Sequence, residues 1–250
     1  VGAENYGTLA YVIESPHESG VIWTGSDDGY VQVTKDNGVT WTNVTPNGLK
    51  ECLINAIEVS PHDPATAYIA TTRYKFNDHT PGLYRTKDYG KTWTNISKGI
   101  PHGSFTRVVR EDEKVKGLLV AGTETGIFIS WNDGATWVPF QLNLPITAIT
   151  DIKLKHDDMI VGTSGRSFWI LDDMELIRQY KTGSQGTKLY QPAATILENH
   201  GSPLNGNSPS FKGTNSFVGV NPANGAVIYY ELPKLKKSDV VTLEIKDKSG

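Results

Sequence analysis

Six side chains in this sequence are of types that could together bind or transform a polar molecule. They comprise three carboxylates, a tyrosine, a histidine and an arginine: Asp28, Tyr74, Asp78, His79, Glu124 and Arg166. Two carboxyl groups that face each other across a sugar, one of them with a raised pKa, can hydrolyse a glycosidic bond. The same groups, carried by loops on a rigid scaffold, can also bind a glycan or a peptide without reacting. The residue types allow both chemistries, and we assign none of the six a catalytic role.

The signatures of other catalytic and metal sites are missing from the sequence. It has no Gly-x-Ser-x-Gly elbow, no His-Glu-x-x-His zinc helix and no phosphate-binding loop. Cys52 is the only cysteine, so neither an intrachain disulfide nor a paired-cysteine metal cage can form. Apart from His79, the histidines are scattered, most of them at loop ends, where a solvated side chain is usual. We therefore expect no metal ion and no cofactor.

The elements that must position these side chains show in an eight-residue phrase that occurs three times. The copies are Thr34–Trp41, Thr86–Trp93 and Ser130–Trp137. They start at residues 34, 86 and 130, so the period is 52 and then 44 residues. This period is typical of a four-stranded propeller blade. The sequence therefore predicts an all-β fold of propeller blades, each an antiparallel sheet of four strands.

Each repeat has the same internal order: two apolar strands, a loop, a third strand, the recurring phrase and a fourth strand. Three complete units give predicted strands at 10–15, 21–25, 30–34 and 40–45, then 55–60, 67–72, 83–86 and 92–96, then 106–110, 118–122, 127–130 and 136–140. A fourth unit has strands at 149–155, 159–162 and 168–171 but lacks the phrase, and 172–178 is typical of a capped helical turn. We expect three blades and a partial fourth within residues 1–180.

Every position of the phrase has a structural role in a hairpin between the third and fourth strands. The acidic residue accepts backbone N–H groups of its own turn, the glycine allows a positive φ angle, and the tryptophan buries its ring near an adjoining blade. Calcium binding or acid catalysis by the acidic residues is the alternative, but Asn132 stands in the acidic place of the third copy, which a carboxylate mechanism would not tolerate. We assign structural roles to Asp36, Gly38, Trp41, Asp88, Gly90, Trp93, Asn132, Asp133, Gly134 and Trp137.

An open row of blades would leave apolar faces in water at both ends, so we expect an incomplete ring that other blades complete. These blades belong to the same polypeptide or, as the alternative, to another protein chain. After residue 180 the pattern changes, and 181–215 is typical of a linker. Strands predicted at 217–220, 226–232 and 240–246 indicate the start of an immunoglobulin- or fibronectin-like β-sandwich in residues 216–250.

Charge and hydropathy argue against two kinds of partner. The formal net charge of −3 offers no basic field for nucleic acid. No apolar stretch approaches the length of a membrane span. The first residue is Val1, with no charged-then-apolar leader behind it, and we expect that processing or truncation has removed what preceded it.

The recurring phrase resembles the Asp-box, or BNR repeat, of sialidases, sortilin-type receptors and xyloglucanase-like propellers. Longer matches at 21–29, 121–126, 142–145 and 162–173 resemble the C-terminal part of a bacterial, sortilin-like BNR propeller group often labelled glycosyl hydrolase. The resemblance covers about residues 5–180 and implies a secreted or cell-envelope protein. Members of that group usually follow the propeller with a β-sandwich whose start resembles residues 221–230.

In a propeller, the loops between second and third strands emerge on the face opposite the recurring hairpins, so we expect the six candidate residues around one rim. The long loop 74–81 is the best functional candidate, because an insertion in one blade adds nothing to blade geometry. Asp28, Glu124 and Arg166 can instead cap turns and neutralise one another. Our leading hypothesis is a non-catalytic binding or scaffold module for a glycan or peptide. The alternatives are a glycoside hydrolase whose site is shared with blades absent from this chain, and a subunit of a larger surface assembly.

Overall fold

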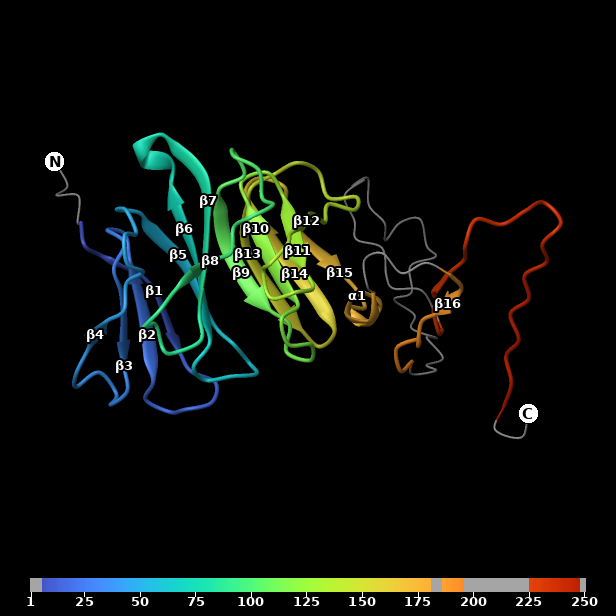
Figure 1. The fold of residues 1–250 in the computed structure, drawn as a ribbon, viewed down its shortest axis with the longest axis horizontal. Coiled ribbons are helices and arrows are strands. Elements are labelled where there is room, and N and C mark those ends of the chain that lie inside the picture. The colour runs from blue at the N-terminus through green and yellow to red at the C-terminus, as the bar shows by residue number, and fades with distance from the viewer. Residues whose placement is uncertain (1–5, 181–185, 196–224, 248–250) are drawn as a thin grey trace, which may run out of the picture. The chain divides into compact units, whose positions relative to one another are not determined.

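The structure, a computed structural model, describes residues 6–180, 186–195 and 225–247 of the chain. The chain divides into two compact units, Val1–Met174 and Glu175–Gly250. Figure 1 labels their strands and helices, and nearly all of this regular structure is β, as the sequence predicts.

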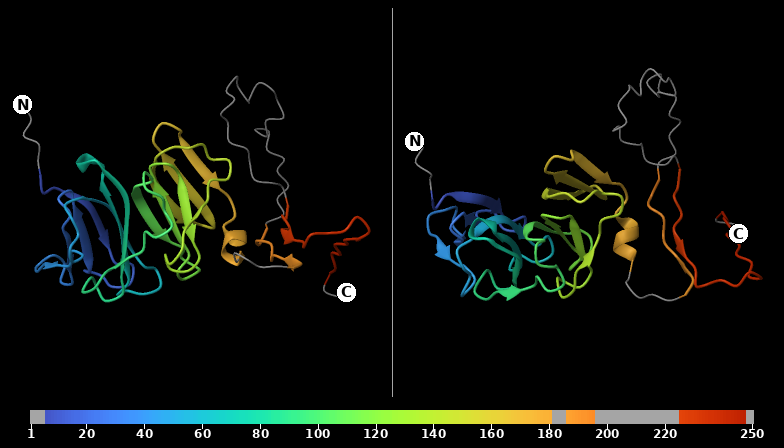
Figure 2. Two further views of the ribbon diagram at one scale, coloured as in Figure 1. Left: turned by 45° about the horizontal axis from the view of Figure 1, so that its top comes forward. Right: turned by 90° about the horizontal axis from the view of Figure 1, so that it is seen from above.

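Four antiparallel sheets follow one another along the first unit (Figures 1 and 2). In each sheet the strands are hydrogen-bonded in sequence order. The first sheet contains β1 (Leu9–Glu14), β2 (Ile22–Ser26), β3 (Val31–Thr34) and β4 (Thr42–Asn43), and the second contains β5 (Leu53–Val59), β6 (Ala67–Arg73), β7 (Asp78–Thr86) and β8 (Thr94–Asn95). The third contains β9 (Thr106–Glu111), β10 (Leu119–Thr123), β11 (Ile127–Ser130) and β12 (Val138–Pro139), and the fourth contains β13 (Ile149–Lys155), β14 (Asp158–Thr163) and β15 (Phe168–Leu171). The prediction of three four-stranded sheets and a partial fourth is confirmed.

The first strands of the four sheets lie side by side, β1 against β5, β5 against β9 and β9 against β13. Each of them carries a β-bulge near its start, at Ala10, Asn55, Arg107 and Thr150. A bulge bends a strand and increases its twist. Because the start of each first strand pairs with the end of the second strand, the bulges lie at the edge of the sheets that carries the loops between second and third strands.

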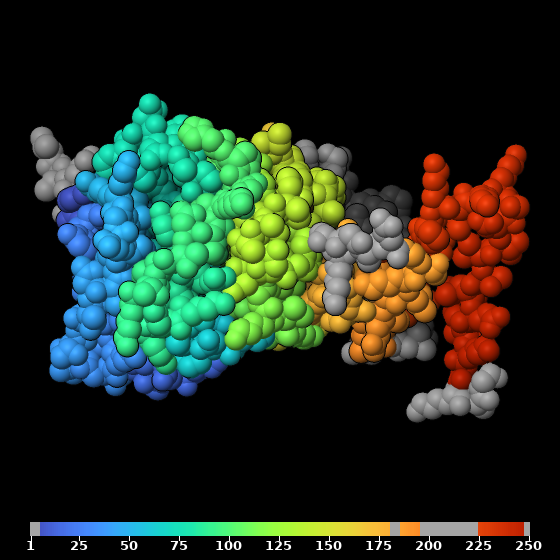
Figure 3. Space-filling model, in the orientation of Figure 1, coloured from blue at the N-terminus to red at the C-terminus, as the bar shows by residue number. Residues whose placement is uncertain are grey.

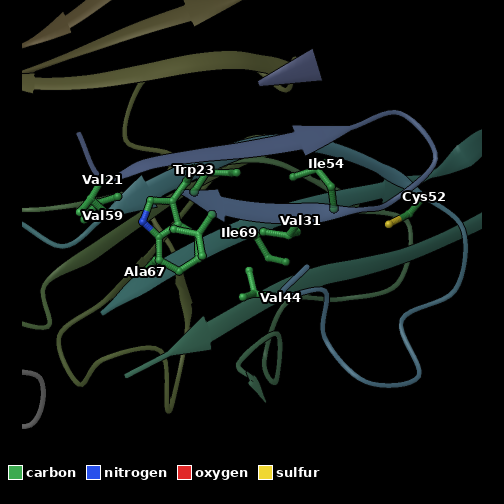
Figure 4. Packing of buried hydrophobic residues seen from close by; sticks show 11 residues of the cluster. Val21, Trp23, Val31, Val44, Cys52, Ile54, Val59, Ala67 and Ile69 are labelled. Atoms are coloured by element: carbon green, nitrogen blue, oxygen red, sulfur yellow. The ribbon is translucent and has the colours of Figure 1, made fainter. Parts of the chain in front are cut away.

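Apolar side chains hold neighbouring sheets face to face. Figure 4 shows this between the first two sheets, where Trp23 and Val31 belong to the same buried cluster as Ile54, Val59 and Ile69. Burying an aliphatic or aromatic side chain of this size contributes about 1.5–3 kcal/mol. The core of the unit therefore lies between the sheets, and each inner sheet depends on two neighbours.

A tryptophan fastens each inner sheet to the one before it. The indole N–H of Trp93 donates to the carbonyl of Val44, at 2.7 Å, and that of Trp137 donates to the carbonyl of Ile96, at 2.6 Å. Each accepting carbonyl follows the fourth strand of the preceding sheet. Trp41, the corresponding residue of the first sheet, donates instead to Gly38 of its own turn, at 3.1 Å.

The recurring hairpin is closed by hydrogen bonds within its eight residues. Asp36 accepts the backbone N–H of Thr40 at 2.8 Å and the hydroxyls of Thr40 and Thr34 at 2.6 and 2.7 Å. Gly38 follows with φ of 87°, a conformation that suits glycine. In the third copy, Asn132 accepts the backbone N–H of Thr136 at 2.9 Å, so an amide closes the turn as a carboxylate does.

The faces at the two ends of the unit are open among the described residues. Val12 and Trp41 are exposed on the first sheet, and Phe168 and Ile170 are exposed on the fourth. The inner-sheet counterparts of Val12 and Phe168 are buried: Ile57 and Val109 for Val12, and Leu83 and Ile127 for Phe168. Apolar faces of this kind mark a place where another surface belongs.

The second unit contains α1 (Glu175–Gln179) and one antiparallel pair, β16 (Lys188–Leu189) with β17 (Tyr230–Glu231). The helical turn predicted at 172–178 corresponds to α1. The strand predicted at 226–232 is represented by β17, residues 240–246 form no strand, and 217–220 lie outside the described residues. Assignment of 181–215 to a linker and 216–250 to a β-sandwich stays a prediction. No helix in the described segments is long and apolar enough to cross a membrane.

The turn chemistry predicts how the first hairpin responds to substitution. Hydrogen bonds from the Thr40 side chain, the Thr40 backbone and Thr34 lower the pKa of Asp36 to about 2. We expect Asp36→Ala to lower the melting temperature at neutral pH, because the backbone N–H of Thr40 loses its acceptor. Asp36→Asn, the matched control, should change it little, since Asn132 already serves in the third copy.

The same pair of variants tests the pH dependence of the turn. A carboxyl whose folded pKa is depressed stabilises the fold above its ordinary pKa, and that contribution is lost as the pH falls through the folded value. The acid sensitivity of the native turn should therefore be weaker in Asp36→Asn. Equal destabilisation by Asn and Ala at neutral pH would contradict this account of the turn.

Candidate functional site

One edge of the sheets carries the loops in which sequence analysis placed the six candidate residues. These loops meet the chain just ahead of each first strand: the N–H of Asp27 donates to Thr8, that of Glu124 to Phe105 and that of Ser164 to Ala148. The connection from each fourth strand to the next first strand therefore lies at the same edge. The sequence analysis took into account the loops between second and third strands but not the connections between blades.

A hairpin extension of the second sheet forms the most prominent part of this edge. Beyond the pairing of β6 with β7, the 3₁₀ turn η1 (Tyr74–Phe76) and Asn77, with φ of 54°, reverse the chain. Tyr74 is 43% exposed and Phe76 is 49% exposed. Figures 1 and 3 show this segment, coloured teal, at the upper edge of the first unit. Two aromatic rings are thus presented to solvent on a short, closed turn.

The base of this hairpin packs on a residue that the sequence did not single out. The ring of Phe105 stacks on Tyr74, with centroids 5.6 Å apart and an interplanar angle of 20°. His79 meets the same ring edge-on at 5.7 Å, and His102 stacks on His79 at 6.4 Å. Phe105 and His102 come from the connection between the second and third sheets. The available signal was an aromatic residue next to a Pro-His-Gly-Ser turn, immediately before a strand.

Ion pairs neutralise the two arginines beside these rings. Arg73 binds Asp78 at 2.9 Å across the base of the hairpin, and Arg107 binds Glu124 at 2.7 Å. The guanidinium carbon of Arg107 also lies 5.2 Å from the Phe105 ring centroid. Hydrogen bonds from the Thr80 side chain and backbone and from Arg73 lower the pKa of Asp78 to about 2. Asp78 is therefore a carboxylate at neutral pH and has no proton to donate.

The structure connects four of the six candidate residues and separates the other two. Tyr74, His79 and Glu124 are linked through Phe105 and Arg107, and Asp78 closes the same hairpin. We call this group, with Phe76 and Arg73, the aromatic rim. Asp28 bonds to Ser26 within the first sheet, and Arg166 lies in the exposed turn of the fourth sheet. Among the described residues, no three His, Cys, Asp or Glu side chains gather as metal ligands.

A carboxyl group with a strongly raised pKa lies away from the aromatic rim. Burial raises the pKa of Glu58 on β5 to about 7, which outweighs the attraction of Arg110 and Lys153 and the hydrogen bond from the Glu111 backbone. The side chain of Glu58 is largely enclosed beside the first strands. The carboxyl group with this raised pKa therefore lies on β5 and not beside Tyr74.

Arg110 on β9 links the first strands of all four sheets. Its guanidinium donates to Asp151 at 2.7 Å and to the Ile152 carbonyl at 2.8 Å on β13, and to the Tyr11 hydroxyl at 3.1 Å on β1. It also lies 3.4 Å from the carboxylate of Glu58 on β5. The guanidinium of Arg110 lies closer to the carboxylate of Asp151 than to that of Glu58, and it therefore compensates the negative charge of buried Glu58 only in part.

Two histidines at loop ends link neighbouring sheets. Nε2 of His17 lies 2.9 Å from the carbonyl oxygen of Ser60, and Nε2 of His62 lies 2.7 Å from that of Asp112. His17 is exposed and His62 is partly buried. The expectation of a solvated side chain holds for His17, which is exposed, and only in part for His62, because a loop end in one sheet packs on the end of the first strand in the next sheet. This contact is invisible in a local sequence window.

Comparison with known proteins identifies the architecture. No protein-family model matches the sequence. The oligoxyloglucan-reducing end-specific xyloglucanase of Emericella nidulans is 25% identical over 116 residues, which are 46% of this chain and 14% of that protein. The structure of YCF48 bound to D1 peptide aligns with a TM-score of 0.50 and 14% identity, covering 74% of this chain and 55% of that one.

Two GH74 enzymes also align with this chain. An ancestral GH74 enzyme gives a TM-score of 0.53 and 16% identity, over 66% of this chain and 23% of that one. The GH74 enzyme of Niastella koreensis gives 0.53 and 17%, over 67% and 28%. The fold is an incomplete β-propeller. Its four sheets are blades, and the chain spans little more than half of YCF48 and much smaller shares of the enzymes.

The Arg110 contacts predict a large loss of stability when this side chain is removed. We expect Arg110→Met to lower the free energy of unfolding by about 3–5 kcal/mol above neutral pH, because it leaves the buried carboxylate of Glu58 uncompensated. Arg107→Met, which breaks the half-exposed pair with Glu124, should cost about 1 kcal/mol or less. Urea unfolding of both variants makes the comparison, and equal losses would contradict the role given to Arg110.

The raised pKa of Glu58 predicts the sign of a pH effect. A carboxyl whose folded pKa lies above its ordinary value of 4.5 stabilises the fold below that value, and this contribution is lost as the pH rises through about 7. The stability of Glu58→Gln relative to the native chain should therefore rise between about pH 5 and pH 8. Glu113→Gln, at an exposed position of the third blade, should show no such trend. A flat difference for Glu58→Gln would show that its carboxyl stays ionised.

Proposed function

We propose that the chain is a non-catalytic binding and scaffold propeller that recognises a glycan or a peptide at its aromatic rim. The observation that carries this proposal is the pairing of exposed aromatic rings with neutralised arginines. Tyr74 and Phe76 offer apolar faces, while Arg73 and Arg107 are held by carboxylates. Such a surface suits a polar ligand, because the two arginines are neutralised and Lys75, exposed on the same turn, offers a single positive charge.

The position of the rings fits recognition better than covalent chemistry. Exposed aromatic and arginine side chains are the residues that most often dominate binding energy at protein surfaces. They stand on a hairpin that is closed at its base by the Arg73–Asp78 ion pair and supported by Phe105. A rigid turn loses little conformational freedom on binding, so more of the contact energy remains as affinity. The structure of YCF48 contains a bound D1 peptide, which is consistent with this use of the fold.

A glycoside hydrolase is the alternative function. The xyloglucanase relative and the GH74 neighbours favour it. The carboxyl groups of the rim argue against it in this chain, because Asp78 is held ionised and Glu124 is bound to Arg107. If the chain takes part in hydrolysis, its site is shared with blades that the chain does not contain.

The repeated hairpin supports a finer assignment, to the Asp-box or BNR propellers of the sortilin-like and xyloglucanase-like group. In all three copies an Asp or Asn accepts the backbone N–H four residues later. We propose a propeller in residues 1–180, a linker in 181–215 and the start of a β-sandwich in 216–250. A secreted or cell-envelope location follows from the same assignment. Further blades of the same polypeptide, or another protein chain, complete the ring.

Substitution of the exposed tyrosine tests the binding proposal. We expect Tyr74→Ala to weaken binding of the purified chain to its glycan or peptide ligand, found on glycan and peptide arrays, by about tenfold or more. Trp41→Ala is the matched control, because Trp41 is equally exposed but lies in a hairpin at the opposite edge of the blades. Isothermal titration of both variants measures the difference, and Asp78→Ala should weaken binding in the same direction by loosening the hairpin.

The same ligands separate the two functions. Incubation with xyloglucan oligosaccharides should give no new reducing ends if the rim only binds. Turnover that disappears in both Asp78→Asn and Glu124→Gln would establish the hydrolase instead. Equal affinity of the native chain, Tyr74→Ala and Trp41→Ala for every ligand that binds would remove the rim from the proposal.

A further inference from the structure

The outward side of the first blade repeats a surface that is buried on the inner blades. Cross-strand pairing places Val12, Thr24 and Gln32 in line on this side of the sheet. The same pairing aligns Ile57, Ile69 and Tyr84 on the second blade and Val109, Ala121 and Phe128 on the third. The tryptophans of the three hairpins extend these rows. We call the side that faces the preceding blade the near face.

Burial of the near face depends on whether a preceding blade is present. On the second and third blades Ile57, Ile69, Val109 and Ala121 are inaccessible to solvent. On the first blade Val12, the counterpart of Ile57 and Val109, is 65% exposed. Trp41 is 42% exposed, whereas Trp93 is partly buried and Trp137 is 5% exposed. Thr24, in the same row, is already buried at 5%, so the apolar part of the near face that the first blade exposes is Val12 and Trp41.

Hydrogen bonds between inner blades show what such a surface accepts. The hairpin tryptophan donates to the carbonyl that follows the fourth strand of the preceding blade, as Trp93 and Trp137 both do. The loop after the first strand of the preceding blade brings a histidine to the carbonyl at the end of the next first strand, Ser60 or Asp112. Ser15 is the residue of the first blade equivalent to Ser60 and Asp112. In each of the three, the backbone N–H donates to a carbonyl across the hairpin between first and second strands.

A third contact joins the hairpins themselves. The ammonium of Lys35 lies 3.4 Å from the ring centroid of Tyr89, and that of Lys87 lies 2.8 Å from the Asp133 carboxylate. In both cases the second residue of one hairpin meets the fourth residue of the next. Asn37 is the fourth residue of the first hairpin and the counterpart of Tyr89 and Asp133. Its amide oxygen can accept a hydrogen bond from a cationic side chain of an incoming hairpin.

We propose that the near face of the first blade is a docking surface for another four-stranded blade of the same repeat, supplied from outside the described residues. The incoming blade offers the carbonyl after its fourth strand to the Trp41 indole, a side-chain N–H from its first hairpin to the Ser15 carbonyl, and a cation to Asn37. Its apolar face covers Val12 and Ile22. The inference rests on the proposed completion of the ring and continues an interface that the chain builds twice.

A second copy of the chain is a poorer occupant. Its outermost surface would be the fourth blade, which has only three strands among the described residues and therefore lacks the carbonyl that Trp41 requires. The second repeat of this chain is a better stand-in for the missing blade. It packs on Val109, Leu119 and Trp137 of the third blade, and the matching positions of the first blade are Val12, Ile22 and Trp41.

Thiol reactivity tests the proposal without knowledge of the natural partner. An extended chain is made in which a second copy of residues 53–105, the second repeat, is inserted directly ahead of Leu9. Leu9 is equivalent to Thr106, the residue that follows this repeat in the native chain, because each precedes the bulge of its first strand. Val12→Cys is introduced into the original and the extended chain, and its reaction with a small disulfide reagent is timed. Cys52, the only native cysteine, is buried and gives a low background. Val39→Cys is the matched control, because Val39 is 81% exposed and its counterparts Lys91 and Ala135 are exposed on the inner blades.

Docking should slow the reaction of Val12→Cys in the extended chain by about tenfold or more and leave Val39→Cys unchanged, because a buried thiol reacts only when the interface opens. Trp41→Ala should then lower the melting temperature of the extended chain more than that of the original chain. Equal reactivity of Val12→Cys in the two chains overturns the proposal. Protection of Val12→Cys in the original chain that increases with protein concentration overturns it in favour of a second copy. Neither readout depends on a ligand at the aromatic rim, so failure here is distinct from failure of the binding proposal.

Discussion

Each blade of this protein must bury both of its faces, and that constraint governs the rest of the structure. A four-stranded sheet of about forty residues encloses no core of its own, so its apolar side chains become core only against a neighbour. Trp23 and Ile69 show the result, since they come from different blades and are both inaccessible to solvent. The bond from the Trp137 indole to the Ile96 carbonyl adds direction to this packing, because it satisfies a polar group that burial would otherwise leave unpaired.

The same constraint leaves one edge of the blades available for recognition. Inter-blade contacts of the hairpins and of His17 and His62 occupy the opposite edge. At the edge beside the bulges, Thr106 of the third blade bonds to Thr72 and Gly82, and beyond these bonds the second blade extends its hairpin through the exposed Tyr74 and Phe76. Phe105 shows that the extension is still anchored, because it fills the space beneath Tyr74 from the adjacent connection. A fixed scaffold with one variable edge is how a repeat fold acquires a binding site.

The sequence predicted those parts of the structure that local interactions determine. The hairpins closed by Asp36, Asp88 and Asn132 are complete within eight residues, so their repetition gave the strands, their order and the blade architecture. The candidate site was only half predicted, because Tyr74 and His79 lie in a conspicuous insertion while Phe105 and His102 come from a different connection. Arg110 could not be assigned at all. Its bond to Tyr11 joins residues 99 positions apart and exists only when four blades stand in a row.

The Arg110 cluster also shows why a perturbed carboxyl need not be a catalytic one. Glu58 has the raised pKa expected of a general acid, yet the cause is enclosure among the first strands, where Arg110 shares its charge with Asp151 and the Ile152 carbonyl. An acid in hydrolysis must reach a substrate with a second carboxyl group on the other side. At the aromatic rim, where a ligand can reach, Asp78 and Glu124 are each committed to an arginine. The raised pKa of Glu58 and the accessible aromatic rim are thus in different places.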